Sequence, residues 1–485
     1  MKVRVRFAPS PTGYLHIGGL RTALYNYLYA RREGGDFILR IEDTDRERYV
    51  EGAVEGLIRV LDRIGLEYDE GPKLEKDIVN EVGDKGPYIQ SDRTEIYREH
   101  VEVLLVKGQV YRCFCSPDRL DSMRKQQQLA KLPTKYDRFC QNLSEEEVTK
   151  RLELGEPFVV RMLVPPGKTV FEDVIRGKVT IDNTEVDDQV LLKSDGFPTY
   201  HLANVVDDHL MGITHVIRGE EWLPSTPKHV ILYNMFGWDL PVFAHLPLIL
   251  NPDKSKLSKR QGDVAVEDYL EKGYLPEALI NFVATLGYNP KGDQEIYSLD
   301  EFVKLFELSK VNASGAIFNT EKLDWLNAHY IREKKPAELA KLCRRFVDHA
   351  QVEISDADLE KLVTIEQERL TRLDQIVAMT EIFQELEYEP GILAWKKADQ
   401  VDAKENITKL IEFVETLGDF ESVDMVEKAV KEYIEGKGLA NGNVLWPMRV
   451  ALSGAAASPG PFELAWALGR DETLKRLYIA LEKLS

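Results

Sequence analysis

Apolar residues in the first part of the chain follow two alternating spacings. A short strand-like run at 3–7 precedes Leu20, Leu24 and Tyr27, which recur at the spacing of one helix face. The same alternation continues to about residue 95. It predicts the first half of a doubly wound, nucleotide-binding parallel sheet.

Residues 96–190 interrupt this alternation. They contain a glutamine run at 126–128, a β-rich segment at 158–162 and a Pro-Pro-Gly turn at 165–167, so we interpret them as an inserted α+β domain. The sheet is expected to resume afterwards, which makes residues 1–95 and 191–250 one Rossmann-type core. Its later strands are predicted at 190–192, 199–200, 215–217 and 245–249.

From Leu275 onward the strand pattern nearly disappears. Segments 359–386 and 423–434 have apolar residues at helical spacing. Residues 331–485 are therefore predicted to form helical bundles, in two subdomains that divide near residue 390. The predicted fold class is a multidomain α/β chain followed by an all-α region.

Two short segments carry the residue types that phosphate chemistry requires. Residues 9–19 form a Gly- and Pro-rich turn between strand and helix, where backbone N–H groups can receive phosphate beside His16 and Gly18. Residues 256–260 place two lysines and an arginine in a loop. Alone, each segment is typical of an ordinary turn or a solvated basic loop, but together they predict two halves of one ATP site.

These two segments are similar to the HIGH and KMSKS motifs of the class I aminoacyl-tRNA synthetases. Three further blocks, at 40–46, 200–209 and 216–223, resemble the bacterial-type glutamyl-tRNA synthetase family. The related glutaminyl enzymes carry Phe-Asp-Asp-Thr-Asn at the first of these blocks, and this chain does not. The resemblance covers most of residues 1–330.

The resemblance implies an ATP-dependent ligase that uses Mg²⁺ with its nucleotide. It would activate L-glutamate to glutamyl-adenylate and transfer the glutamyl group to the 3′-terminal adenosine of glutamate tRNA. The insertion at 96–190 and residues 251–330 would contact the acceptor stem, and the helices at 331–485 would bind the anticodon. The expected ATP-binding residues are Pro9, Ser10, His16, Gly18, Gly19, Lys256, Leu257, Ser258, Lys259 and Arg260, of which His16, Gly18, Lys256 and Lys259 are the expected catalytic residues.

Glutamate needs one anionic partner for its ammonium group and cationic partners for its two carboxylates. By resemblance Glu42 holds the α-amino group, Arg6 lies against the carboxylate end of the amino acid, and Arg218 pairs with the side-chain carboxylate. Alternative roles are sheet packing for Tyr200 and turn capping for Ser10. The expected glutamate-binding residues are Arg6, Ala8, Ser10, Glu42, Tyr200, Asn204 and Arg218.

Gln367 and Arg369 are the expected tRNA-binding residues of the helical region. Family members restricted to glutamate tRNA tend to place an arginine against the third anticodon base, and the matching position here is Gln367; a shift of one residue would put Glu366 there instead. An arginine donates two hydrogen bonds to a cytosine edge, whereas a glutamine amide donates or accepts. The sequence therefore predicts charging of glutamine tRNA as well as glutamate tRNA.

Cys113, Cys115 and Cys140 are spaced like the zinc knuckle of some family members. Zinc-binding relatives have a histidine two positions after the last cysteine, where this chain has Asn142, and Tyr136 would be an unusual substitute. The alternative is three buried reduced thiols, which we favour. ATP and Mg²⁺ are thus the expected cofactors, and no metal ligand is assigned.

The composition limits the remaining choices. The chain has 485 residues, 44% of them hydrophobic, and no apolar run near the ~20 residues of a membrane helix. We therefore expect a soluble, cytoplasmic monomer without membrane contact. The formal net charge of −19 does not indicate nucleic-acid binding, so the tRNA partner rests on the motifs.

Three rival functions remain open. A truncated paralogue that glutamylates a modified tRNA base lacks an anticodon-binding part, unlike residues 330–485 here. A small-molecule nucleotidyltransferase shares HIGH-like turns but needs neither the helical region nor the block at 40–46. A catalytically dead tRNA-binding module would not need His16, Glu42 and Arg218.

Overall fold

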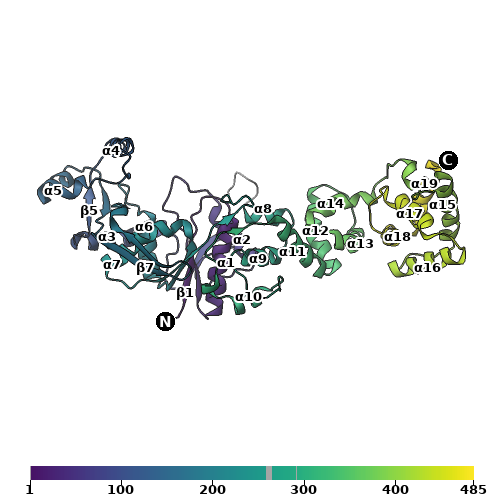
Figure 1. Cartoon of the computed structure of the whole chain (residues 1–485), viewed down its shortest axis with the longest axis horizontal. Helices are drawn as coiled ribbons and strands as arrows, with labels where there is room; N and C mark the ends of the chain where they lie inside the picture. The colour runs from purple at the N-terminus through teal and green to yellow at the C-terminus, as the bar shows by residue number, and fades with distance from the viewer. Residues whose placement is uncertain (1, 258–264, 291) are drawn as a thin grey trace. The chain divides into compact units, whose positions relative to one another are not determined.

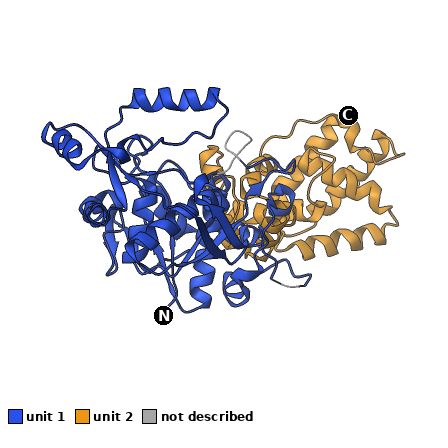
Figure 2. Cartoon of the chain, turned by 60° about the vertical axis from the view of Figure 1, so that its left-hand side comes forward, with its two compact units in different colours: residues 1–271, 276–323 blue, residues 272–275, 324–485 orange. Residues whose placement is uncertain are grey.

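Two compact units make up the chain (Figure 2). The computed structural model describes residues 2–257, 265–290 and 292–485. Residues 1–271 and 276–323 form the first unit, and residues 272–275 and 324–485 form the second. The first unit mixes strands and helices, whereas residues 324–485, all of them described, contain helices and no strand (Figure 1).

Short strands separated by helices build the first unit. The strands are β1 (Arg4–Phe7), β2 (Asp36–Leu39), β3 (Gly71–Glu75), β4 (Ile78–Val82), β5 (Val110–Cys113), β6 (Val159–Met162), β7 (Lys168–Asp173), β8 (Gly177–Asp182), β9 (Val190–Leu192), β10 (His215–Gly219), β11 (Val242–Leu246), β12 (Ile249–Leu250) and β13 (Ala316–Ile317). The helices that begin in it are α1 (Ile17–Arg32), α2 (Ala53–Arg63), α3 (Thr94–Val106), α4 (Pro117–Leu129), α5 (Glu145–Glu153), α6 (Tyr200–Leu210), α7 (Thr226–Phe236), α8 (Val266–Glu271), α9 (Pro276–Ala284), α10 (Leu299–Leu305) and α11 (Thr320–Glu333).

A parallel sheet forms the centre of this unit. β1 pairs in parallel with β2, and β10 pairs in parallel with β11. Thr214, just before β10, joins the two pairs by donating its N–H to the carbonyl of Arg4 at 2.9 Å. Because α1 connects β1 to β2 and α7 connects β10 to β11, each pair is a strand–helix–strand unit of a doubly wound sheet. The predicted Rossmann-type core is confirmed.

Two strands of the predicted insertion, β5 and β6, form a separate sheet with β9, in the order β5, β6, β9. The expectation that the central sheet resumes at 190–192 is therefore wrong, because β9 pairs with β6 and Leu191 is buried with Val160 in a core shared with α3 and α6. Residues 199–200 likewise do not form a strand, since α6 begins at Tyr200. Instead β7 and β8 extend the central sheet beside β11. A short apolar run cannot specify which sheet it joins; long-range packing decides this.

The second unit continues from α11 as a series of helices. No helix among the described residues is both long and apolar enough to cross a membrane. The helices of the second unit are α12 (Pro336–His349), α13 (Asp356–Glu366), α14 (Ile376–Met379), α15 (Gln400–Glu415), α16 (Val423–Gly436), α17 (Asn441–Ser453), α18 (Pro461–Leu468) and α19 (Arg470–Lys483).

Segment 359–386 is not one continuous helix, although its apolar spacing is helical. Asn327 donates its side-chain amide to the carbonyl of Thr371 at 2.7 Å. The side-chain oxygen of Gln375 accepts the N–H groups of Thr371 and Arg372 at 2.9 and 3.1 Å. Side chains thus bond backbone groups that a continuous helix would pair internally, which separates α13 from α14.

Candidate active site

The loop between β1 and α1 surrounds one side of a cavity of 360 Å³. His16 caps α1, because its Nδ1 accepts the N–H of Gly19 at 3.0 Å. A Cβ on Gly18 would lie only 3.0 Å from two atoms of the His16 imidazole. Glycine therefore lets this ring lie against the first turn of the helix, where the positive end of the helix dipole also lies.

The residues predicted to bind glutamate and most of those predicted to bind ATP come together at this cavity. They come from β1 and the loop after it, the segment after β2, the start of α6, and β10. All seven predicted glutamate-binding residues line the cavity, namely Arg6, Ala8, Ser10, Glu42, Tyr200, Asn204 and Arg218, as do Pro9, His16, Gly18 and Gly19.

An adjoining cavity of 200 Å³ brings the second predicted ATP segment to the first. His16 and Gly18 line both cavities, and Lys256 and Leu257 line the adjoining one. Ser258, Lys259 and Arg260 lie outside the described residues. The two halves of the predicted ATP site therefore approach each other at Lys256.

A buried chain of ion pairs joins Arg6 to Glu42. Arg6 Nε lies 3.0 Å from Asp208 Oδ1, and Arg40 Nη1 lies 2.7 Å from the same oxygen. Arg40 Nη2 then lies 3.0 Å from Glu42 Oε1. The opposite charges clustered after β2 thus find their partner in Asp208 of α6, which fixes Arg6 and Glu42 relative to each other.

Burial and ion pairing act against each other on the carboxyl groups of this chain. Burial raises the pKa of Glu42, and its ion pair with Arg40 offsets this only in part. Burial would also raise the pKa of Asp208, but Arg6 and Arg40 together hold it below its ordinary value. Asp208 therefore stays ionised and neutralises arginine charge inside the protein.

Arg218 has different surroundings, since its side chain donates only to neutral groups. Its Nη1 lies 2.8 Å from the Tyr200 hydroxyl and 3.3 Å from His229 Nδ1. Its Nε lies 3.1 Å from His245 Nε2, and its Nη2 lies 2.9 Å from Thr226 Oγ1. The residue is only 4% exposed, and within the described residues its guanidinium forms no ion pair. A buried, unneutralised cation beside a cavity indicates a site for an anionic group.

Asn204 and Tyr200, both on α6, line the same cavity as Arg218. Asn204 is 2% exposed, and its side-chain Nδ2 has no hydrogen-bond partner among the described residues. Tyr200 lies at the start of α6, and its ring centroid is 4.2 Å from that of Trp222. Tyr200 therefore belongs to the cavity wall and not to a strand, and Asn204 offers a buried donor to a ligand.

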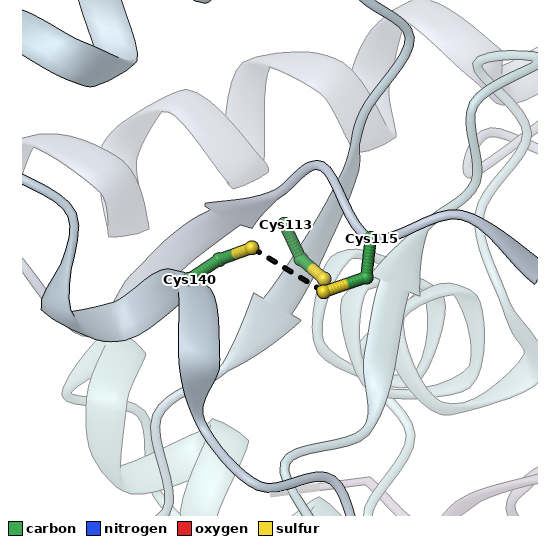
Figure 3. A group of neighbouring side chains, drawn as sticks. All are labelled: Cys113, Cys115 and Cys140. Carbon is green, nitrogen blue, oxygen red and sulfur yellow. Dashed lines mark hydrogen bonds between the residues drawn. The ribbon is translucent and has the colours of Figure 1, made fainter. Parts of the chain in front are cut away.

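Three cysteines of the inserted domain lie together, as Figure 3 shows. Cys115 Sγ is 3.5 Å from Cys140 Sγ, and the Tyr136 hydroxyl is 3.3 Å from the sulfur atoms of both Cys113 and Cys115. Asn142 does not join them; its amide donates to a backbone carbonyl at 3.4 Å. Three thiols and a hydroxyl oxygen are donor types that zinc accepts, although tyrosine is not among its usual ligands.

Gln367 and Arg369 follow α13 in the second unit. The Gln367 amide nitrogen donates to the carbonyls of Ile331 and Lys334 at 2.8 and 2.7 Å, at the C-terminal end of α11. Arg369 is about half exposed and donates to the carbonyl of Ile365 at 3.0 Å. Gln367 therefore caps a helix, and its amide donor is already used within the protein.

Comparison with known proteins assigns the family. Residues 2–325 match the model described as "tRNA synthetases class I (E and Q), catalytic domain", and residues 338–481 match an anticodon binding domain. The glutamate–tRNA ligase of Clostridium acetobutylicum is 45% identical over 491 residues, which cover 100% of this chain and 99% of that protein. This chain belongs to the glutamate–tRNA ligase family of class I tRNA synthetases.

Other members of the glutamate–tRNA ligase family agree over the whole length. The enzyme of Alkaliphilus metalliredigens is 46% identical, with 99% of each chain covered. A crystal structure of a glutamate tRNA ligase from Elizabethkingia meningosepticum in complex with its amino acid matches with a TM-score of 0.90 at 40% identity, and 100% of both chains is covered. The structural similarity thus includes both units of this chain.

Sequence reasoning missed the buried residues that hold Arg6 and Arg218 in place at the cavity. Asp208 was seen only as part of a motif block, and the Arg218 partners Thr226, His229 and His245 were not singled out. The available signal was weak: the two histidines occur in apolar segments at 229–236 and 242–250, where an isolated polar residue needs a buried partner.

Proposed function

We propose that this protein is a glutamate–tRNA ligase that activates glutamate with ATP and transfers it to the 3′-terminal adenosine of tRNA. The observation that carries the proposal is the buried, unneutralised Arg218 in the same cavity as the capped N-terminus of α1. The first offers a site for a substrate carboxylate and the second a site for phosphate. Relatives that match over nearly their whole length are named glutamate–tRNA ligase.

The charged residues of the cavity match the charged groups of glutamate. Glu42 receives the α-ammonium group, Arg6 lies near the reacting carboxylate, and Arg218 pairs with the side-chain carboxylate. Glutamine would leave the Arg218 charge unpaired, which is costly in a buried site. Asn204 Nδ2, a buried donor, adds a hydrogen bond to the bound amino acid.

Adenylate formation needs positioning and charge stabilisation. The α-carboxylate oxygen of glutamate forms a bond to the α-phosphorus of ATP, and the bond from that phosphorus to pyrophosphate breaks. The N-terminus of α1, which has no acidic residue in its first turn, and His16 stabilise the charge that develops there. Lys256, which lines the adjoining cavity, adds positive charge near the phosphates, and the motif resemblance gives Lys259 the same role. Mg²⁺ bound with the nucleotide would neutralise part of the phosphate charge.

The tRNA range of the enzyme includes glutamine tRNA. The position of the family's discriminating arginine is taken here by Gln367, or by Glu366 if the alignment shifts by one residue. The Gln367 amide also donates to carbonyls at the end of α11. The third anticodon base therefore meets no pair of arginine donors from this position. We propose that the enzyme acts in the cytoplasm as a monomer.

ATP–pyrophosphate exchange with total tRNA tests the main proposal. Exchange that requires glutamate and is not supported by glutamine, followed by formation of tRNA carrying labelled glutamate at its 3′ end, is the expected result. Labelling of an internal base would favour the truncated-paralogue function. Exchange with a small molecule in place of both amino acids would favour a small-molecule nucleotidyltransferase, and no exchange would favour a non-catalytic tRNA-binding module.

A further inference from the structure

In each of the two histidines that contact Arg218, the ring nitrogen facing the guanidinium must be unprotonated. A guanidinium only donates hydrogen bonds, so His245 Nε2 and His229 Nδ1, at 3.1 and 3.3 Å, have to accept. Neither of these nitrogens can carry a proton in this arrangement. The Arg218 position therefore depends on the tautomer of two buried imidazoles.

A second residue behind each histidine fixes that tautomer. His245 Nδ1 lies 2.6 Å from Asp173 Oδ2, so its proton is on Nδ1 and Nε2 is free to accept. His229 Nε2 lies 3.2 Å from His201 Nδ1, so its proton can sit on Nε2 and leave Nδ1 to accept. The four groups come from β7, α6, α7 and β11, and two of them, His229 and His245, contact Arg218 of β10 directly.

Asp173 is held away from Arg218. Its carboxylate accepts the backbone N–H groups of Ile175 and Arg176 at 3.0 and 2.9 Å, in addition to the His245 side chain. Asp173 therefore reaches Arg218 only through the His245 imidazole, and among the described residues it forms no ion pair with Arg218. Arg6, which lines the same cavity as Arg218, is in contrast paired directly with Asp208.

We propose that His229 and His245, oriented by His201 and Asp173, are positioning residues that hold Arg218 with neutral acceptors and so leave its charge for the side-chain carboxylate of glutamate. This inference rests on the proposed pairing of Arg218 with glutamate. A carboxylate in place of either histidine would pair with Arg218 itself and compete with the substrate. Neutral acceptors supply orientation without that competition.

Three nearly isosteric variants at one position separate the effects. His229→Asn keeps a neutral acceptor near the Nδ1 position, His229→Leu removes the acceptor, and His229→Asp makes it anionic. Relative to the wild-type enzyme, we expect the KM for glutamate to rise less than about 3-fold for Asn, about 10-fold or more for Leu and about 100-fold or more for Asp. The KM for ATP should stay within about 2-fold in all three.

A background without Arg218 tests whether His229 acts through it. In the Arg218→Gln enzyme, His229→Leu should raise the glutamate KM by less than about 2-fold more, because the group that it positions is gone. His215→Leu, which changes a histidine of β10 that does not contact Arg218, is the matched control and should leave the glutamate KM unchanged. Melting temperatures of all variants report folding separately from these constants.

The outcomes distinguish the inference from the proposed function. If Arg218→Gln charges tRNA like the wild type, the pocket assignment in the proposed function fails. If Arg218→Gln is impaired but His229→Asp behaves like His229→Asn, the proposed function stands and the neutral-acceptor inference is wrong. If His229→Leu does not fold, His245→Gln and His245→Glu give the same comparison of a neutral with an anionic acceptor.

Discussion

Two buried arginines in one cavity have opposite surroundings, and at the residue scale this difference defines the pocket. Arg6 is neutralised by Asp208, whereas Arg218 meets only hydroxyl groups and imidazoles among the described residues. Removing a guanidinium that pairs with substrate leaves the substrate carboxylate desolvated without a partner. Substrate selection should therefore be most sensitive at Arg218.

Arg218→Gln should lower kcat/KM for glutamate by at least ~100-fold, which corresponds to ~3 kcal/mol of lost stabilisation for a desolvated carboxylate. The melting temperature should change little, because the partners of Arg218 are neutral and no buried anion is left unpaired. Steady-state tRNA charging at varied glutamate concentration measures the effect. Charging within ~5-fold of the wild type would show that another group selects the carboxylate.

The buried histidines make folding sensitive to mild acid. Burial lowers the pKa of His229 and His245, and burial with nearby Lys228 lowers that of His201 to about 3. Below pH ~6.5 the unfolded chain binds protons that the folded state does not, so the free energy of unfolding falls as pH falls, by up to ~1.4 kcal/mol per pH unit for each histidine.

Denaturant midpoints measured at pH 7.5, 6.5 and 5.5 test this expectation. The midpoint should be nearly constant over the first interval and fall over the second, and His201→Asn should make that fall shallower. A midpoint that stays constant down to pH 5.5 would mean that these histidines are protonated in the folded protein.

At the element scale, the N-terminus of α1 is the proposed site where phosphate charge is stabilised. Its first-turn N–H groups, its dipole and the His16 cap all lie at the wall shared by the two cavities. A helix N-terminus stabilises anions, and a donor whose contact strengthens as charge develops lowers the barrier more than it tightens binding. The effect of removing it should appear mainly in kcat.

His16→Ala should lower kcat for glutamate-dependent pyrophosphate exchange by ~100-fold or more, and the KM for glutamate should change by less than ~3-fold. The variant also loses the helix cap, which costs about 1 kcal/mol of stability. His215→Ala serves as a histidine control from the same unit. A change confined to KM would remove His16 from the phosphate-transfer step.

Zinc binding would depend on the three thiols of Cys113, Cys115 and Cys140, which β5 and the turns after it bring together. The Asn142 amide bonds a backbone carbonyl, and the Tyr136 hydroxyl, which is not a usual zinc ligand, lies beside the thiols. The purified protein should therefore retain less than one equivalent of zinc. Elemental analysis after dialysis against a chelator measures this. Tyr136→His supplies a common zinc ligand and should increase zinc retention. Stoichiometric zinc in the wild type would mean that Tyr136, water or another group completes the site.

At the scale of the whole molecule, the proposed activation site and the residue proposed for tRNA selection belong to different units. The cavity is lined entirely by residues of the first unit, and Gln367 belongs to the second. The overall charge of −19 gives no general attraction for tRNA, so selection depends on local contacts.

The wild-type enzyme should charge glutamate tRNA and glutamine tRNA transcripts with kcat/KM values less than ~1000-fold apart, a difference equivalent to ~4 kcal/mol. Parallel charging of the two transcripts with glutamate measures the ratio. Gln367→Ala should leave this ratio within ~3-fold while lowering stability, because Gln367 caps α11. A larger difference in the wild type would contradict the proposed tRNA range.

The sequence by itself determined the local features of this protein. The strand near 3–7, the turn at 9–19, the helix that follows it and the charges of Arg6, Glu42 and Arg218 follow from spacing and residue type, which act over a few positions. The change from α/β to helical structure was visible for the same reason. Each of these depends on neighbours in the chain.

Only the tertiary structure decided which of these groups are neutralised. Arg6 and its partner Asp208 are 202 positions apart, and His245 meets Asp173 across 72. The choice of sheet for β9 and of Tyr136 over Asn142 beside the thiols also depends on contacts between distant segments. Pattern and propensity act locally, whereas desolvation and ion pairing depend on everything packed around a group, so the electrostatics of the site exist only in the folded chain.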